Sequence, residues 1–190
     1  MPTLLQNIKF ITSAIGQNES RKNLMVVKCW SKDEYFHMLA ADGFIIKTVK
    51  MWKNFPHAYF VADDVHFYID FESVKKILKI AKKDSVFTLY EDSVIVDNVR
   101  ISYKKYECDY PNLDNIINSD IQVDQSKFAF NYDFMTKCLK DAYFDDKRNC
   151  YAKISFVTNE NNKKTKSPIN KIEFENGEQT AFVMPVVTEW

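Results

Sequence analysis

Glycine is scarce in this sequence of 190 residues, which contains only three. Neither Gly-rich phosphate-binding motif, GxGxxG or GxxxxGKS/T, occurs, which argues against nucleotide binding through such a loop. No apolar run is long enough to span a membrane, and we expect no secretory signal peptide. An excess of one charge is also lacking, because 26 basic residues balance 26 acidic ones. If the protein meets nucleic acid, it therefore does so with one face.

Residue types that bind metals or carry out catalysis are few and dispersed. The four cysteines stand without CxxC spacing, at Cys29, Cys108, Cys138 and Cys150. This pattern predicts a reduced, cytoplasmic protein without a zinc site. The three histidines are isolated, at His37, His57 and His66, and Asp63-Asp64 fits a polar turn better than a metal-binding pair. No nucleophile can be placed beside a base, so we expect a protein that is not an enzyme and uses no metal or cofactor.

The first part of the chain shows a helical pattern followed by strands. Apolar residues spaced by three and four predict a helix over 3–16. A strand is predicted over 23–30, and two more over 35–52, separated at Asp42-Gly43, which is a strong turn signal. Residues 53–65 are predicted to form a connector around a proline.

The next segment begins with an alternating strand at 66–70 and continues as a helix over 72–83, with Asp70 at the N-cap position. The apolar residues of this helix share one face and most of its lysines the opposite one. Short strands follow at 85–90, 93–97 and 99–107. Residues 108–118 are predicted to be irregular.

The pattern then restarts, which indicates an internal repeat. With an offset of 61 residues, Asp70 matches Asn131, Lys76 matches Lys137 and Lys79 matches Lys140. The predicted elements are a strand at 127–131, a helix at 132–143, strands at 150–158, 169–176 and 179–187, and a polar loop at 159–167. We therefore expect an α+β fold of three β-α-β-β-β units with helices on one face of antiparallel sheets, the first unit lacking its opening strand. Two units form a domain at 1–118, and the third forms a half domain at 119–190.

Four local motifs, in this order, resemble the bacterial-type DNA sliding clamp, the β subunit of DNA polymerase III. LLQNIKFITSA with SRKNLMVVKCW resembles the start of a clamp domain, and LAADGFII (39–46) resembles the turn of the clamp. The stretch at 66–117 is similar to a clamp half-domain with its connector, here YPNLDNII. FAFNYDFMTKCL with TAFVMPVV resembles the last half-domain. Each motif is weak alone, but together they cover nearly the whole chain.

Two departures from the clamp pattern stand out. The chain has about half the length of a bacterial clamp subunit, and Phe44-Ile45 replace the usual His-Arg of the turn. The resemblance implies a DNA clamp fold, in which twelve half-domain units close a ring with helices lining a central hole. Three units in a chain divide into twelve four times, so we expect a homotetrameric ring. A compact clamp of this kind would suit a phage, acting in the cytoplasm of a bacterial host.

Lysines gather on the predicted helices, and the segment at 72–85 alone contains five. The resemblance implies that they attract the phosphates of duplex DNA without reading its sequence. Flexible ammonium groups suit a sliding contact better than bidentate arginines do. The candidates are Lys9 on the first helix, Lys75, Lys76, Lys79, Lys82 and Lys83 on the second, and Lys137 and Lys140 on the third, with Arg21 and Lys22 near the first. The alternative is an ordinary solvated helix face.

The resemblance also implies an apolar pocket that accepts short peptides from the DNA polymerase and the clamp loader. Its candidate residues come from the turn, at Ala41, Gly43, Phe44, Ile45 and Ile46, and from the closing strand, at Val183, Met184, Pro185 and Val186. The alternative is that these residues pack the core, above all Ile46 and Val183. Met184-Pro185 is the better candidate, because a proline without an N–H belongs at a strand end or edge.

The function implied is that of a processivity factor that encircles duplex DNA and tethers replication proteins, loaded by a partner ATPase. A second hypothesis is a clamp-like decoy that inhibits a host clamp or clamp loader without encircling DNA. A third is an oligomerisation module with no role at DNA. Ring stoichiometry separates the first two hypotheses, and charge reversal at Lys75, Lys79 and Lys82 tests the third.

Overall fold

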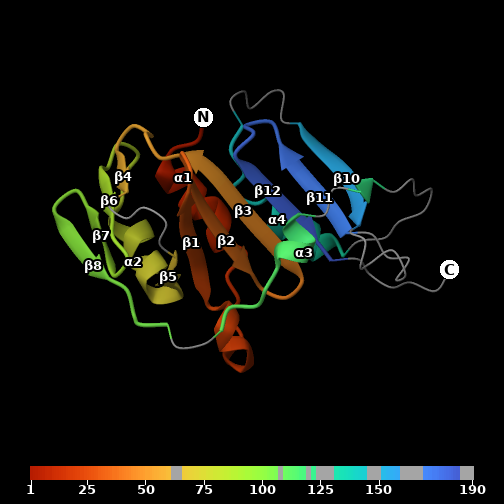
Figure 1. Ribbon diagram of the computed structural model, residues 1–190, viewed down its shortest axis with the longest axis horizontal. Coiled ribbons are helices and arrows are strands. Elements are labelled where there is room, and N and C mark those ends of the chain that lie inside the picture. The colour runs from red at the N-terminus through yellow and green to blue at the C-terminus, as the bar shows by residue number, and fades with distance from the viewer. Residues whose placement is uncertain are drawn as a thin grey trace.

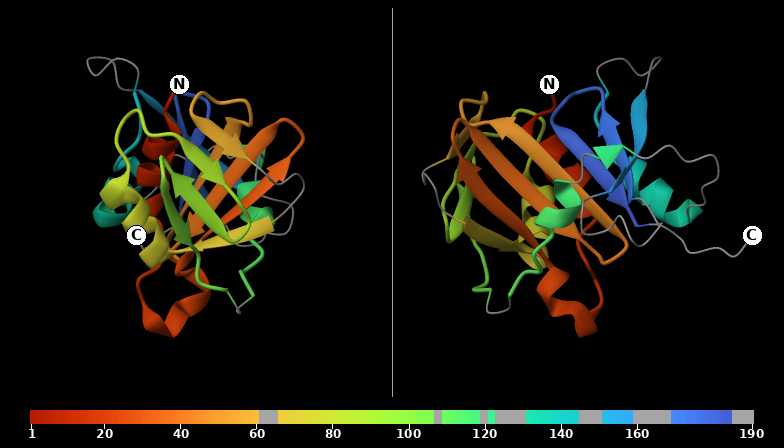
Figure 2. Two further views of the ribbon diagram at one scale, coloured as in Figure 1. Left: turned by 90° about the vertical axis from the view of Figure 1, so that its left-hand side faces the viewer. Right: turned by 45° about the vertical axis from the view of Figure 1, so that its right-hand side comes forward.

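The computed structural model shows an α+β fold, which confirms the class predicted from the sequence (Figure 1). The helices α1, α2 and α4 gather on one side of the sheets, as the left view of Figure 2 shows. Within the part of the chain that the structure describes, no helix is both long and apolar enough to cross a membrane. The described residues are 1–60, 66–106, 109–118, 121–122, 131–144, 151–158 and 169–184.

The first unit, residues 1–60, opens with a capped helix. The Thr3 hydroxyl accepts a hydrogen bond from the Gln6 backbone N–H, and the Gln6 side chain accepts one from the Thr3 N–H, which together form a capping box. Asp42 and Gly43 form the predicted turn between two strands. The elements are α1 (Leu4–Thr12), the 3-10 helix η1 (Glu19–Leu24), β1 (Val26–Lys32), β2 (Tyr35–Ala41), β3 (Ile45–Trp52) and β4 (Ala58–Phe60).

The second unit, residues 66–102, has a carboxylate at its helix start. Asp70 accepts hydrogen bonds from the backbone N–H groups of Ser73 (3.1 Å) and Lys104 (2.8 Å). One side chain therefore caps the helix and fixes the chain that leaves the last strand. The elements are β5 (His66–Asp70), α2 (Phe71–Ile80), β6 (Phe87–Leu89), β7 (Ser93–Val96) and β8 (Val99–Ser102), followed by the short helix α3 (Asp114–Ile117) in the connector.

The helix of the third unit, residues 121–184, has a side-chain N-cap like that of α2. The Asn131 side chain accepts from the N–H groups of Asp133 (2.8 Å) and Phe134 (3.4 Å). The helices of the second and third units begin at residues 71 and 132, so the offset of 61 in the sequence also separates the helix starts. The elements are β9 (Ile121–Gln122), α4 (Tyr132–Leu139), β10 (Ala152–Thr158), β11 (Ile169–Phe174) and β12 (Gln179–Val183).

The strands form two sheets. The larger has eight strands in the order β5-β1-β2-β3-β12-β11-β10-β9, and the smaller has the order β4-β6-β7-β8. In the larger sheet, β3 pairs with β12 from Ile45 opposite Val183 to Val49 opposite Gln179. This β3–β12 pairing, called the seam below, joins the first unit to the third, so that one sheet runs across the expected boundary at residue 118.

Strand β4 was not predicted, because it lies in the expected connector at 53–65. It pairs in parallel with β6 over three residues, from Ala58 opposite Phe87 to Phe60 opposite Leu89. In the smaller sheet β4 is the edge strand next to β6, just as β5 is the edge strand next to β1 in the larger sheet. The strand that the first unit lacks at its start is thus replaced by one at its end.

All three predicted helices end earlier than expected, and α1 stops at Thr12 rather than at residue 16. Helix α2 stops because Ala81 adopts an extended backbone and the Lys82 N–H donates to the Ser85 hydroxyl (2.9 Å), so Lys82 and Lys83 follow the helix. Helix α4 ends at Leu139, with an extended backbone at its C-cap. The stretch predicted to be irregular, 108–118, contains α3. The predicted strand at 127–131, apart from its last residue, and the polar loop at 159–167 lie outside the described residues.

The eight-stranded sheet separates two apolar clusters. The main core lies on its helix side and includes fully buried Phe10 and Ile11 of α1, Ile77 of α2 and Cys138 of α4. The smaller cluster lies on the opposite face, under α3, and includes buried Leu24, Leu39, Ala41, Ile46 and Phe182. Alternation along β3 places every second residue in the main core and the others on the α3 side.

Candidate pocket and lysine-bearing helix face

An apolar cavity of about 370 Å³ lies where η1, the β2–β3 turn, α3 and the end of β12 meet. Its size lies within the range of roughly 300–1,000 Å³ that is typical of ligand sites. Its lining residues lie on the α3 side of the sheet. Helices α1 and α4 cover the other side (Figure 2). The cavity, called the seam pocket below, is lined by Arg21, Asn23, Leu24, Ala41, Gly43, Ile46, Pro111, Leu113, Ile116 and Met184.

The turn beside the seam pocket depends on Asp42 and Gly43. The Asp42 carboxylate accepts hydrogen bonds from the N–H groups of Phe44 (2.9 Å) and Ile45 (3.0 Å). Gly43 has φ +95°, and a Cβ at this position would collide with the Arg21 guanidinium. Glycine therefore allows Arg21 to close over the turn, where its Nη1 donates to the Asp42 carbonyl (3.4 Å).

Phe44 connects the turn to the third unit. Its ring stacks on Phe134 of α4 with centroids 4.7 Å apart, and the Arg21 guanidinium lies 5.5 Å from its centroid. The Phe44 carbonyl also accepts a hydrogen bond from the Met184 N–H (2.9 Å). The aromatic side chain that departs from the clamp turn thus packs between two units.

The lysines of the helix face are all exposed. Lys9 lies on α1, Lys75, Lys76 and Lys79 on α2, Lys82 and Lys83 just after it, Lys137 on α4 and Lys140 at its C-cap. Among the described residues, two of them form ion pairs: Lys75 Nζ lies 2.8 Å from Glu72 Oε1, and Lys137 Nζ lies 3.2 Å from Asp42 Oδ2. Both pairs are at least partly solvated, so each holds its lysine only weakly.

Solved structures of bacterial sliding clamps share this architecture. The Bacillus subtilis DNA polymerase sliding clamp matches with a TM-score of 0.70 at 14% identity, over 98% of this chain and 63% of that one. The β subunit of the DNA polymerase of Streptococcus pyogenes matches with a TM-score of 0.71 at 12% identity, over 97% and 64%. The Thermotoga maritima DNA polymerase III β subunit matches with a TM-score of 0.70 at 11% identity, over 98% and 64%. The chain has the sliding-clamp fold.

The shared feature is the fold rather than the sequence. No protein-family model matches the chain, and no curated protein does. The chain spans less than two thirds of the length of the clamps it matches. The DNA clamp fold expected from the order of the four motifs is thereby confirmed, although at 11–14% identity the match shows fold alone.

On this clamp fold, the residues expected for a peptide pocket divide into four groups. Ala41, Gly43, Ile46 and Met184 line the seam pocket. Ile45 and Val183 are completely buried in the main core instead, because they occupy the helix side of β3 and β12. Phe44 lies in the turn beside the pocket, and its ring stacks on Phe134 of α4. Pro185 and Val186 lie outside the described residues.

Sequence reasoning missed part of the lining. Arg21 was expected near the DNA-facing helix, but it lies over the β2–β3 turn at the pocket. Leu24 belongs to η1, which a strand prediction over 23–30 concealed. Leu113 is the N-cap residue of α3 and Ile116 lies within the helix, and their apolar spacing of three within the connector motif was the available signal.

One lysine is completely buried. Lys47 of β3 is 0% exposed, its Nζ donates to the Lys140 carbonyl at the end of α4 (2.7 Å), and it lies 4.0 Å from the Phe10 ring centroid. Burial lowers the pKa of the Lys47 ammonium from 10.5 to about 7, against the opposing influence of Cys138 and Asp141. Burial also raises the pKa of the Cys138 thiol to about 12, so this thiol offers no negative charge near neutral pH.

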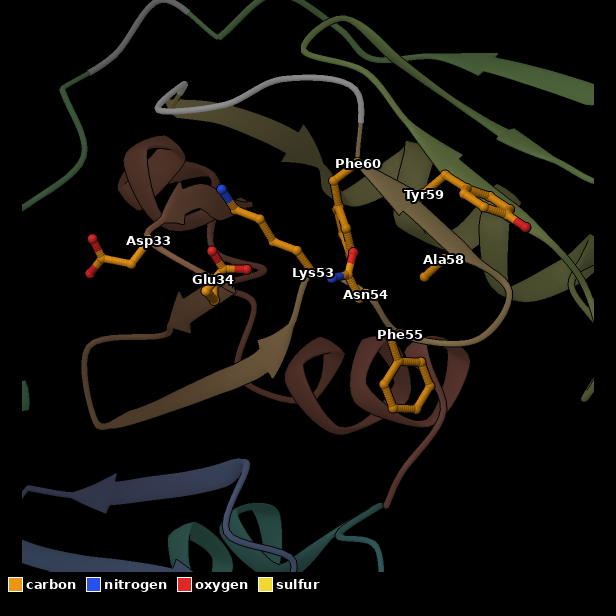
Figure 3. A pocket seen from close by; sticks show the side chains of 8 residues that line it. All are labelled: Asp33, Glu34, Lys53, Asn54, Phe55, Ala58, Tyr59 and Phe60. Carbon is orange, nitrogen blue, oxygen red and sulfur yellow. The ribbon is translucent and has the colours of Figure 1, made fainter.

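A larger hollow of about 840 Å³ lies elsewhere, between the β1–β2 turn and the β3–β4 connector. Its lining mixes charged and aromatic side chains, labelled in Figure 3: Asp33, Glu34, Lys53, Asn54, Phe55, Ala58, Tyr59 and Phe60. It lacks the apolar floor of the seam pocket and therefore suits a peptide anchor less well. Among the described residues, no three His, Cys, Asp or Glu side chains come together as a metal site.

Proposed function

We propose that this protein is a non-enzymatic sliding clamp, which encircles duplex DNA as a homo-oligomeric ring and tethers replication proteins. The observation that carries the proposal is the division of the fold into two faces. Three capped helices present lysines on one face, and the apolar seam pocket opens on the other. A clamp needs both, because DNA lies inside the ring and partners dock outside it.

The lysines of the helix face suit duplex DNA that slides through a ring. Lysines attract phosphates without reading bases, so the contact is equally favourable at every position along the duplex. Lys76 and Lys79 of α2 and Lys9 of α1 have no ion-pair partner among the described residues. A closed ring cannot leave DNA sideways, so such modest attractions suffice. We propose that Lys75, Lys82, Lys83, Lys137 and Lys140 add to the same surface.

The seam pocket suits a short apolar peptide segment. Leu24, Ile46 and Ile116 provide an apolar floor, while Arg21 and Asn23 provide a polar rim. We propose that the DNA polymerase and the ATPase that loads the ring dock here through linear peptides. A ring of four chains, each with three units, contains the twelve units of a closed clamp.

Retention on closed circular DNA, compared with the same DNA linearised, tests the proposal. Wild-type protein loaded by its loader should remain on circles and leave linear ends. Charge reversal at Lys76 and Lys79 should weaken DNA association and lower its dependence on salt. The matched control reverses Lys32 and Lys105, which are exposed and lie outside the helices. Equal loss in both variants, or equal retention on circles and linear DNA, would refute the proposal. A monomer that still binds partner peptides would favour the decoy function instead.

A further inference from the structure

The first two units complete each other by exchanging strands. Helix α1 packs against α2, β5 of the second unit pairs along β1 of the first, and β4 of the first pairs along β6 of the second. Together they enclose one core, to which both helices contribute. The third unit has the same plan, but no sister unit follows it within the described residues.

Helix α4 is more exposed than α2 at equivalent positions. At the offset of 61 residues, Tyr132 and Leu139 correspond to Phe71 and Leu78. Phe71 and Leu78 are partly buried and pack against the main core. Tyr132 is 77% exposed and Leu139 is 44% exposed. Residues seven apart lie on one side of a helix, so this is one continuous apolar face.

Strand β10 shows the same difference when it is compared with β1. Strand β1 pairs with β5 over five residues, whereas β10 pairs with β9 only at Val157 and Thr158 among the described residues. Ile154 lies opposite Ile172, whose side chain is buried in the main core, so Ile154 is on the helix side of the sheet. It is nevertheless 47% exposed. The core of the third unit is therefore open on the side where a sister unit would pack.

We propose that the third unit of a second copy of this chain covers this open face, so that two half domains form one composite domain across a twofold axis. The surface, called the open face below, consists of Tyr132, Thr136 and Leu139 of α4 with Ile154 of β10. A second copy fits because the first two units already show that this plan pairs with itself. The inference deepens the proposed clamp function, on which its role in the ring rests.

The charges of α4 favour an antiparallel partner helix of the same sequence. Asp133 lies in the first turn and Lys140 at the C-cap, seven residues apart and hence on one side. In a twofold pair, Asp133 of each copy would lie near Lys140 of the other. The two helix dipoles would run antiparallel, which favours the pairing. Four chains would then hold four complete domains and two composite ones, which makes twelve units.

The mass of the full-length protein in solution, measured by light scattering over a range of concentrations, tests the inference. Leu139→Glu should halve the mass of the wild-type oligomer, because it places a charge in the contact. The matched control, Val86→Glu, alters an exposed apolar residue of the second unit, away from the open face, and should leave the mass unchanged. Thr136→Cys, near the twofold axis, should form a covalent dimer under mild oxidation, which neither the wild type nor Val86→Cys forms.

A monomeric wild type, or an unchanged mass in Leu139→Glu together with no cross-link in Thr136→Cys, would overturn the inference. Circular dichroism of each variant checks that the fold is kept. The clamp function fails separately: a protein that loses mass in Leu139→Glu and cross-links through Thr136→Cys, yet is never retained on circular DNA, has the composite domain without being a clamp. Retention on circles with neither effect would preserve the clamp and refute the composite domain.

Discussion

Replacing Lys47 by methionine should remove most of the pH dependence of stability between pH 7 and 9. The lysine is completely buried between β3, α1 and the end of α4, with a carbonyl and an aromatic ring as its contacts. Burial disfavours the charged form and lowers the pKa of Lys47 to about 7. In the unfolded chain the same group keeps its proton up to its ordinary pKa of 10.5.

The sign follows from proton binding. Between pH 7 and 10.5 the unfolded state holds more protons than the folded state, so the free energy of unfolding rises with pH. A full proton contributes about 1.4 kcal/mol per pH unit, so the two units from pH 7 to 9 contribute at most about 2.7 kcal/mol. Burial also lowers the pKa of His37 to about 4, but this group acts below pH 6.5. Above pH 9 the trend reverses, because burial raises the pKa of Cys29, Cys138, Tyr103 and Tyr110.

The assay is urea denaturation at several pH values between 7 and 9, at constant ionic strength. The wild type should gain stability across this range, and Lys47→Met should remain nearly level. Lys76→Met, which removes an exposed lysine, should retain the wild-type slope. A Lys47→Met variant with the wild-type slope would show that Lys47 stays protonated in the folded state, and the reasoning from burial would then be wrong.

Three further predictions concern single side chains. Asp70→Ala should lower the free energy of unfolding by about 1–2 kcal/mol in urea denaturation, because the caps at α2 and after β8 are both lost; no change would mean that water replaces them. Gly43→Ala should weaken the binding of a clamp-binding peptide, measured by calorimetry. The reason is that Arg21 must move away from the turn and that an alanine at φ +95° is strained by about 1–2 kcal/mol. Unchanged affinity and stability would contradict this. Phe44→Ala should expose α4 to faster amide hydrogen exchange than the wild type, because the stack on Phe134 contributes about 0.5–1.5 kcal/mol beyond its buried area; equal exchange rates would show that the stack does not hold α4.

Local signals in the sequence predicted the repeat well. Asp70 and Asn131 mark helix starts through short-range hydrogen bonds, and Asp42-Gly43 marks a turn for the same reason. Strand β4 escaped prediction because three residues carry no clear alternation, and its partner β6 lies far along the chain. Structure that depends on distant pairing leaves little trace in local sequence.

The sequence-based predictions missed part of the pocket lining and the buried lysine, for two different reasons. Leu24 and Ile116 meet only in the folded chain, so no spacing in the sequence joins them. Lys47 did leave a signal: it occupies an inward position of β3, between Ile45 and Val49, which are both buried in the main core. A charged residue in that register predicts a buried ammonium, but the lysines of the helices drew attention to exposed charge instead.

Ligand binding in the seam pocket depends on the first and third units staying packed together. Its walls come from both sides of the seam, since Ala41 and Ile46 belong to the first unit and Met184 follows β12 of the third. A ligand that requires both walls must oppose their separation, by about 2.7 kcal/mol at a hundred times its dissociation constant. Conversely, a chain whose third unit has detached offers no complete site. Partners would thus bind only correctly folded protein, and their binding would in turn prolong the life of the folded form.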